Sequence, residues 1–404
     1  MEKRVREWAK EGIKRGYTNQ EIIDLLSQNN FESKQIEEIL SICDALRKSN
    51  NLHKDFLEDK RGEEQKEIYV KDGENAVIPD EIKKVSELIS KTKKEVAKVV
   101  IGQEKVIDAF ICALLCDGHV LLEGIPGIAK TLIVKTLAEA SGCSSKRIQF
   151  TVDLLPSDIL GVTTYTPQKG FETIKGPIFA NFIIADEINR SPPKTQSALI
   201  ECMQEKQVTI GKETFKLSLP FFVMANNNPI ETSGVYDLPE AQIDRFLFKL
   251  FIHYPQNKEE KKIMEENITL KKFEDFNIKP ILSQKKIIDM QNITKSIYMD
   301  DKVKNYIINI VDKTRQKDFK NSEYIEWGAS PRASIGLFIA SKAWALMNGR
   351  DYVIPEDVKD IAHYVLRHRI ILNYKAAAQG INSDKIIDKI LNEVDIEDGF
   401  KKKT

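Results

Sequence analysis

The feature that most constrains this chain is a glycine-containing loop that ends in lysine and threonine. Residues 121–131 read LLEGIPGIAKT, an apolar strand pattern that passes through this loop into a helix pattern. Small residues let the backbone N–H groups of such a loop turn onto phosphate oxygens, and the following helix adds its positive dipole end. Lys130 is then placed to neutralise phosphates and Thr131 to offer its hydroxyl to Mg²⁺. The strict pattern has glycine where this chain has Ala129, so the motif alone also allows an ordinary turn from strand to helix.

A second motif follows at residues 182–187, which read FIIADE. Ligands of open α/β folds bind at the carboxyl ends of the strands, where this apolar strand places Asp186 and Glu187. Asp186 would hold Mg²⁺ through water, and Glu187 would orient or deprotonate the attacking water. An acidic pair on its own is commonly a solvated turn. With a phosphate loop upstream, the pair indicates a nucleoside triphosphate site.

Three further segments carry candidate side chains. The strand FFVMANNNP ends in Asn226, Asn227 and Asn228, whose amides can hold the lytic water or the γ-phosphate, although asparagine before proline is also ordinary turn chemistry. Arg245, in LPEAQIDRF, lies at a helix end from which it can reach a neighbouring subunit's nucleotide. Arg332, in ASPRAS, opens a helix and can contact the γ-phosphate of its own subunit. Arginines are mostly surface residues, so neither decides the matter alone.

The composition is that of a globular protein without excess charge. Of 404 residues, 42% are hydrophobic, and 61 basic residues balance 61 acidic ones, which argues against general nucleic-acid binding. No segment approaches about 18 uninterrupted apolar residues, so we expect no membrane span. Residues 1–12 lack the apolar region of a secretory signal. The 5 cysteines show no disulfide pattern, which favours a cytoplasmic location.

Several residues with metal-binding or titratable side chains are more simply structural. Cys112 and Cys116 have the i, i+4 spacing of a metal-binding pair, but their apolar surroundings favour packed core thiols. His119 and His253 flank strands and are expected to be structural histidines. The helical run 363–369, with two histidines and two arginines, is expected to be a solvated face or a subunit contact.

The periodicity along the chain predicts an α/β fold with four parts. These are an N-terminal three-helix module (1–50), a charged linker (51–79), a phosphate-loop core with a parallel sheet flanked by helices (80–255), and an all-helical C-terminal domain with a tail (256–404). Two hairpin-like segments with turns at Gly170 and Gly211 interrupt the alternation of strands and helices in the core.

Over about residues 85–395 the chain resembles the MoxR-type AAA+ ATPases. The matching blocks are VIGQEKVI, GHVLLEGIPGIAKT, ADEINRSPPKTQSALIECMQE, NPIETSGVYDLPEAQIDRF, ASPRA and GRDYVIPEDV…VLRHRI. Alanine before the lysine is common in that family. The resemblance implies that the C-terminal domain is an AAA+ lid and that the two hairpins are the helix-2 and pre-sensor-1 inserts. Relatives usually lack an N-terminal region like residues 1–75. This region faintly resembles small adaptor modules, and the alternative interpretation is a helical cap.

The resemblance also implies the nucleotide contacts. Lys130 and Thr131 would belong to Walker A and Asp186 to Walker B, with Thr131 and Asp186 as ligands of Mg²⁺. The implied contacts with ATP are Gln103, Gly124, Ile125, Pro126, Gly127, Ile128, Ala129, Lys130, Thr131, Leu132 and Asp186.

The implied catalytic residues are Glu187 of Walker B, Asn228 as sensor 1, Arg245 as the arginine finger acting in the neighbouring subunit, and Arg332 as sensor 2. Where the family usually reads ATQNP this chain reads ANNNP, which leaves the hydrogen bonding of Asn226 open.

These roles imply an ATP-dependent homo-oligomeric ring, expected to be a hexamer, that remodels or assembles client proteins, with a von Willebrand factor A domain protein as partner. Three alternatives stay open. The same core is used by helicases and magnesium-chelatase subunits, although neutral charge disfavours a helicase. A nucleotide-gated scaffold would bind ATP with little turnover. In the third alternative, residues 1–75 recruit other proteins and the chain is chiefly an adaptor.

Overall fold

The computed structural model describes residues 79–124, 130–168, 170–227, 235–266, 273–316, 319 and 321–395. All of them belong to the second of two units of the chain, residues 72–404. The predicted N-terminal module and the linker as far as residue 78 lie outside the described residues.

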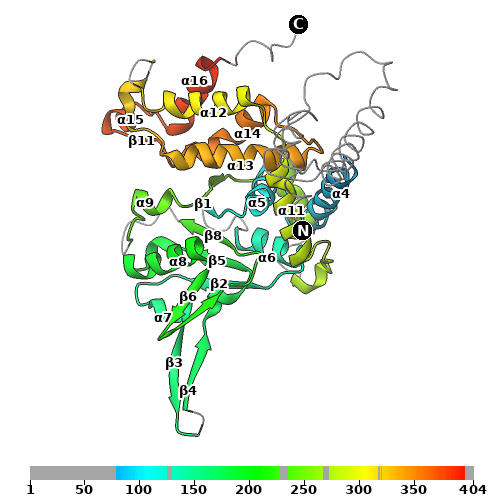
Figure 1. Ribbon diagram of the computed structural model, residues 1–404, viewed down its shortest axis with the longest axis vertical. Helices are drawn as coiled ribbons and strands as arrows, with labels where there is room; N and C mark the ends of the chain where they lie inside the picture. Colours follow the sequence, from blue (N-terminus) through cyan, green and yellow to red (C-terminus); the bar gives the residue numbers. More distant parts are fainter. Residues whose placement is uncertain are drawn as a thin grey trace, which may run out of the picture. The chain divides into compact units, whose positions relative to one another are not determined.

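A five-stranded parallel sheet forms the centre of the described fold, in the order β2-β5-β8-β1-β9 (Figure 1). Its strands are β1 (Val120–Gly124), β2 (Ser145–Gln149), β5 (Phe182–Asp186), β8 (Phe222–Asn227) and β9 (Phe248–Ile252). Every residue of β5 is buried, as expected for a central parallel strand covered on both faces. The α/β core predicted from the sequence is therefore confirmed.

Alternate side chains of the strands point to opposite faces and enter two different hydrophobic clusters. Phe182 and Ile184 join one cluster, whereas Ile183 and Ala185 join the other. The first face is covered by helices α4 (Pro79–Val96), α5 (Glu104–Leu115) and α6 (Lys130–Ala140). The second is covered by α7 (Pro156–Leu160), the 3-10 turns Pro177–Phe179 and Ile188–Arg190, and α8 (Pro193–Glu205). The short α9 (Glu240–Ile243) precedes β9.

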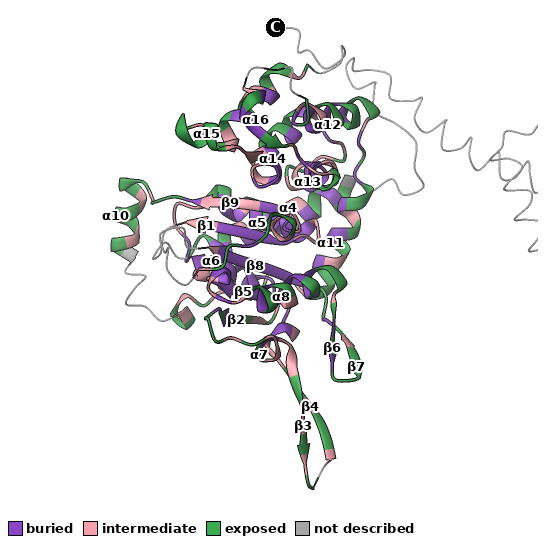
Figure 2. Cartoon of the chain, turned by 90° about the vertical axis from the view of Figure 1, so that its left-hand side faces the viewer, coloured by how far each residue is buried: buried purple, intermediate pink, exposed green. Residues whose placement is uncertain are grey.

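The two predicted hairpins are present. One pairs β3 (Gly161–Thr166) with β4 (Gly170–Lys175), and the other pairs β6 (Gln207–Ile210) with β7 (Glu213–Lys216). Gly170 and Gly211 have φ of 78° and 64°, the left-handed conformation that favours glycine in tight turns. Figure 2 shows β3–β4 extending away from the sheet, and its residues are exposed or intermediate rather than buried.

Helices make up most of the C-terminal region. They are α10 (Asn257–Glu266), α11 (Gln284–Ser296), α12 (Asp301–Lys313), α13 (Pro331–Met347), α14 (Pro355–Leu366), α15 (Tyr374–Ala378) and α16 (Ser383–Glu393), with 3-10 turns at Phe273–Phe276 and Ser322–Tyr324. The prediction of an entirely helical domain was wrong, because β10 (Ile325–Trp327) and β11 (Ile371–Leu372) form an antiparallel ribbon. β-Branched Ile325 and Ile371 suit such a ribbon, which is too short to show an alternating pattern in the sequence.

The C-terminal helices share one hydrophobic cluster with the first face of the sheet. This cluster contains Leu337 and Ala340 of α13 together with Phe110 of α5 and Leu122 of β1. Within the described residues the lid is thus packed onto the core through a continuous apolar interior.

The thiols and His119 behave as structural groups. Cys112 is buried and its thiol donates to the carbonyl of Ala340 at 3.6 Å. No group of three or more metal-ligating side chains occurs among the described residues. His119 accepts a hydrogen bond at Nδ1 from the Val223 N–H (3.1 Å), which leaves Nε2 to donate to the Met203 carbonyl (3.1 Å). None of the described helices is both long and apolar enough to cross a membrane.

Candidate nucleotide-binding site

The predicted phosphate loop begins at the last residue of β1 and ends at the first residue of α6. Residues 125–129 lie outside the described part of the chain, as does Asn228, so the structure does not place these predicted contacts. Lys130 is 9% exposed, and its ammonium donates to the carbonyl of Gly124. Burial lowers the pKa of Lys130, while the carboxylates of Asp186 and Glu187 oppose that shift. A buried ammonium at the N-terminus of a helix is suited to phosphate oxygens.

Asp186 of the second motif is in direct contact with Thr131 of the phosphate-loop motif. It is 4% exposed at the end of β5, and its Oδ2 accepts a hydrogen bond from the Thr131 hydroxyl at 3.2 Å. Arg147 of β2 also pairs with Oδ2, and the amide of Asn226 donates to Oδ1. A hydroxyl and a carboxylate in direct contact supply the hard oxygen ligands that Mg²⁺ prefers. The residues present therefore fit a magnesium ion.

Glu187 adopts a left-handed backbone conformation (φ 56°, ψ 51°) directly after the strand. For a residue other than glycine this conformation costs about 1–3 kcal/mol and needs support from its surroundings. That support includes Asn226, whose Oδ1 accepts the Glu187 N–H at 2.6 Å. The Glu187 carboxylate is in turn held by Gln149 (2.6 Å) and Arg190 (3.1 Å).

Asn226 thus contacts both acids of the predicted Walker B motif, through its amide nitrogen to Asp186 and its amide oxygen to Glu187. The sequence indicated a polar strand end here but not this bridge. Sequence reasoning missed Arg147 and Gln149 altogether. Their alternation on β2 is a signal only once β2 is known to lie beside β5, where Gln149 is in register with Asp186.

The two predicted arginines lie at the junction of core and lid. Arg332 is the second residue of α13 and pairs with Asp244 at 3.4 Å. Arg245 follows α9, is partly exposed, and makes no side-chain hydrogen bond or ion pair with any described residue. The structure does not bring either guanidinium into contact with Lys130, Asp186 or Glu187.

A separate cavity of about 430 Å³ includes Gln103 in its lining. Its wall comes from Gly102 and Gln103 before α5, from Phe251 and His253 at the end of β9, and from Tyr364 of α14. The Gln103 amide donates to the His253 carbonyl at 3.2 Å. Because Ile252 is in register with Gly124, this cavity opens beside the start of the phosphate loop.

A parallel sheet with a loop lysine and two acids at its carboxyl edge defines a nucleoside triphosphate hydrolase. Residues 119–248 match the ATPase family associated with various cellular activities (AAA), and residues 318–390 match the AAA lid domain. The chain is 44% identical to the chaperone MoxR1 of Mycobacterium tuberculosis over 74% of this chain and 80% of that protein. It is 43% identical to the uncharacterized protein YeaC of Bacillus subtilis, over 76% of this chain and 95% of that protein.

The fold is also similar to the crystal structure of a candidate ATPase from Cytophaga hutchinsonii, with a TM-score of 0.74 and 45% identity. That similarity covers 78% of this chain and 97% of the other. The chain belongs to the MoxR family of AAA+ ATPases and is an ATP hydrolase.

Proposed function

We propose that this protein hydrolyses ATP with Mg²⁺ at sites shared between the subunits of a homo-oligomeric ring, expected to be a hexamer, and uses the resulting motion to remodel client proteins. The observation that carries the proposal is the chain of contacts from Thr131 through Asp186 and Asn226 to Glu187. It links a metal-binding hydroxyl to a candidate general base at one edge of the sheet.

In this proposal, Thr131 and Asp186 hold Mg²⁺, which would neutralise charge on the β- and γ-phosphate oxygens. Lys130 binds the same oxygens, as its burial beside the loop suggests. Glu187 accepts a proton from the attacking water. Its contacts with Gln149 and Arg190 hold its carboxylate near the strand end.

Three further groups complete the proposed site. Asn228 senses the γ-phosphate, and Arg332 contacts it from the lid of the same subunit. Arg245 reaches the nucleotide of the neighbouring subunit, a role that suits a guanidinium without a partner among the described residues. The adenine would enter the cavity beside Gln103, whose volume of about 430 Å³ suits a small-molecule pocket.

The client-directed part of the proposal is supported by the relative in Mycobacterium tuberculosis, which is named a chaperone. A von Willebrand factor A domain partner and a cytoplasmic location are further parts of it. The free state of the four described cysteines, Cys112, Cys116, Cys143 and Cys202, is compatible with a reducing compartment.

The test is steady-state turnover of ATP, with and without Mg²⁺, by the wild type and by Glu187→Gln. Loss of a general base lowers a rate by about 10²–10⁴-fold, so we expect the variant to bind nucleotide but turn it over at least about 100-fold more slowly. Glu201→Gln, an exposed position on α8, is the matched control and should keep wild-type turnover. Equal turnover by Glu187→Gln and the wild type would refute the assignment of the base.

One observation favours a second candidate, a nucleotide-gated scaffold. Arg147 pairs with Asp186 and Gln149 with Glu187, so both acids have protein partners. If those contacts persisted with ATP bound, the wild type would turn over ATP as slowly as Glu187→Gln does. The same assay therefore separates the scaffold from the motor.

A further inference from the structure

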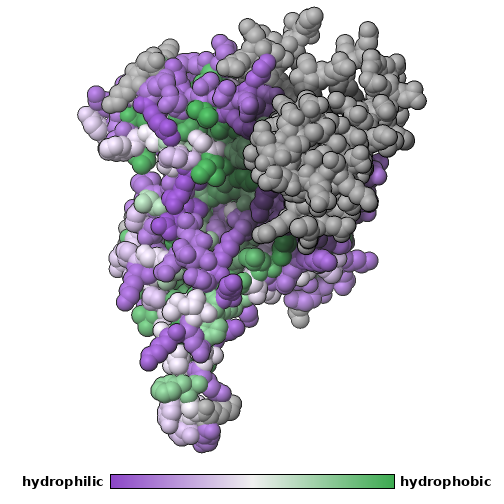
Figure 3. All heavy atoms as spheres, in the orientation of Figure 1, coloured by the Kyte–Doolittle hydropathy of each residue, from purple (hydrophilic) through white to green (hydrophobic). Residues whose placement is uncertain are grey.

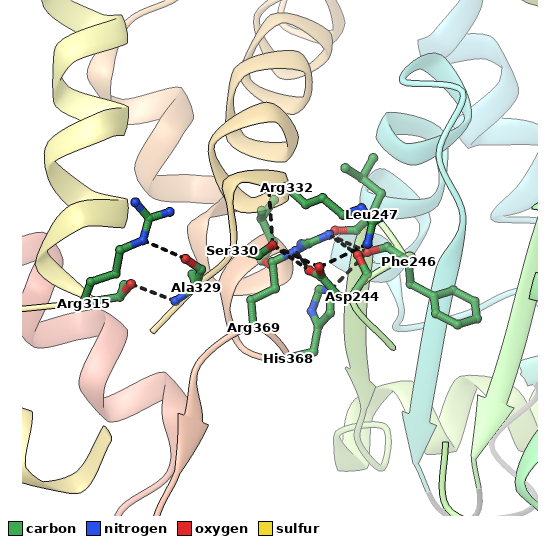
Figure 4. A network of polar contacts seen from close by, with 11 residues as sticks. Asp244, Phe246, Leu247, Arg315, Ala329, Ser330, Arg332, His368 and Arg369 are labelled. Atoms are coloured by element: carbon green, nitrogen blue, oxygen red, sulfur yellow. Dashed lines mark hydrogen bonds and ion pairs between the residues drawn. The ribbon is translucent and has the colours of Figure 1, made fainter. Parts of the chain in front are cut away.

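The turn between α9 and β9, residues 244–247, receives most of its lid contacts from one side chain, Arg369, while the ring of His368 also bonds the Phe246 carbonyl at 3.1 Å. The Nη2 of Arg369 donates to the carbonyls of Asp244 (3.1 Å) and Phe246 (2.7 Å), and its Nη1 donates to the carbonyl of Leu247 (3.1 Å). Its Nε donates to the Asp244 carboxylate at 2.9 Å. Figure 4 shows the Arg369 guanidinium between the lid and this turn of the core.

All five N–H donors of Arg369 are used, because the remaining Nη1 hydrogen is donated to the carbonyl of Val365. The residue is 6% exposed. Burial lowers its pKa to about 10, and the nearby Asp244 carboxylate opposes that shift. A buried charge of this kind is tolerated only when it is paired and hydrogen-bonded. Lysine could not reproduce this planar set of donors.

Arg245 lies inside the segment that Arg369 holds. Both of its neighbours in the chain, Asp244 and Phe246, have their carbonyls bound by Arg369. Its own backbone N–H is bound by the Gln242 carbonyl at 3.1 Å. The Arg245 side chain, in contrast, is partly exposed and has no polar partner among the described residues. A fixed backbone with a free guanidinium is the arrangement expected of a group that acts on another molecule.

The Asp244 carboxylate extends the connection to the start of α13. It accepts the Ser330 hydroxyl at 3.0 and 3.1 Å and pairs with Arg332 at 3.4 Å. Ser330 caps that helix by accepting the Arg332 N–H. One carboxylate therefore contacts both Arg332, at the start of α13, and Arg369, just after the end of α14.

We propose that Arg369, together with Asp244, is a positioning residue that sets where Arg245 lies, so that the lid of one subunit controls the arginine supplied to its neighbour's ATP. This inference rests on the proposed role of Arg245 in a shared site. Under this inference, the lid contacts of one subunit affect the active site of the adjacent subunit rather than the active site of the same subunit.

Mixing of inactive variants tests the inference. Glu187→Gln has a dead site but an intact finger, whereas Arg245→Ala has an intact site but no finger. Their mixture should regain activity. Arg369→Gln alone should lose about 100-fold in turnover, the typical effect of a displacement of about 1 Å, with its affinity for a fluorescent ATP analogue unchanged. Mixed with Glu187→Gln it should regain activity, and mixed with Arg245→Ala it should not.

The opposite pattern, rescue by Arg245→Ala and not by Glu187→Gln, would show that Arg369 serves its own site and would overturn the inference. Rescue by both partners, or by neither with a folded variant, would overturn it as well. If Arg245→Ala itself is not rescued by Glu187→Gln, the shared site fails, and this inference fails with it. ATP turnover by the wild type would then still stand.

Two further variants guard against loss of the fold. Arg369→Lys keeps the charge but lacks the five-donor geometry, and it should show the same rescue pattern in milder form. Arg350→Lys is the matched control, since Arg350 is a half-buried lid arginine whose side chain bonds Asp357 and the Tyr352 carbonyl. It should lose stability without losing turnover.

Discussion

At the scale of single residues, Asn226 has the most direct consequence for chemistry. Its amide donates to Asp186 and accepts from the Glu187 backbone, so one side chain fixes the relative position of the two acids for which we propose different tasks. Neither acid is adjacent to Asn226 in the sequence, and only the pairing of β5 with β8 brings them together.

We expect Asn226→Ala to lower the turnover of ATP by about 100-fold through misplacement of Glu187, with nucleotide affinity retained. The isosteric Asn226→Asp would place a second carboxylate against Asp186 and should be equally inactive. Asn373→Ala, which removes the partly exposed N-cap of α15, is the control and should cost stability only. Wild-type turnover by Asn226→Ala would contradict the bridging role.

Buried His119 predicts that the folding stability of the protein depends on pH. Burial lowers the pKa of His119 to about 4, because it disfavours the charged imidazolium, and the hydrogen bond to the Met203 carbonyl opposes that shift only in part. The unfolded chain then binds more protons than the folded one between pH 6.5 and 4, so stability falls as the pH falls through that window. With about 1.36 kcal/mol per pKa unit, this histidine accounts for about 3 kcal/mol.

Urea unfolding of the wild type and of His119→Gln at several pH values measures this contribution. The variant can keep one donor and one acceptor but cannot titrate, so its stability should depend less steeply on pH. His368, whose pKa burial also lowers, supplies a remaining slope of the same sign in both proteins. Parallel pH profiles would contradict the assignment.

At the scale of elements, the two hairpins are joined at their bases. The Lys175 ammonium lies 4.9 Å and 5.1 Å from the ring centres of Phe179 and Phe215. The two rings pack edge to face at 6.2 Å. Further out, Tyr165 and Phe171 pack at 5.1 Å but stay exposed, and Figure 3 shows hydrophobic surface on this projecting part.

Because the base of the hairpins is packed and the outer part is exposed, we expect a Phe→Ala substitution to reduce stability more at the base. Phe215→Ala removes an aromatic pair and a cation–π contact, so it should destabilise the protein by about 1–2 kcal/mol. Phe171→Ala, at a side chain 79% exposed, should stay within about 0.5 kcal/mol of the wild type. Urea unfolding of both variants decides the point, and equal losses would mean that the tip of the hairpin is also structural.

What the sequence could predict depended on how local each feature is. Lys130 begins a helix and Asp186 ends a strand, each within its own sequence motif. The periodicity of the sequence was therefore enough to predict their positions in these elements. Arg147 and Arg369 could not be found in this way, because their partners lie on elements that only the strand order and the docking of the lid bring near. The run 363–369 was expected to be a solvated face or subunit contact, yet His368 and Arg369 are buried against the core.

At the scale of the whole molecule, core and lid share one apolar interior and are further joined by polar contacts around Asp244. We propose that such a junction transmits a change at the nucleotide as movement of packed bodies rather than as local flexing. In the proposed mechanism the partly exposed Arg245 beside that junction carries the movement to a second subunit, which is why assembly is central to it.

The most direct measurement is the specific ATPase activity as a function of protein concentration, for the wild type and for Arg245→Ala. If each active site is completed by a neighbouring subunit, wild-type activity per subunit rises with concentration to a plateau, while Arg245→Ala stays low throughout. Activity that is independent of concentration down to monomeric protein, and that survives in Arg245→Ala, would show that one chain holds a complete site and would contradict the shared-site mechanism.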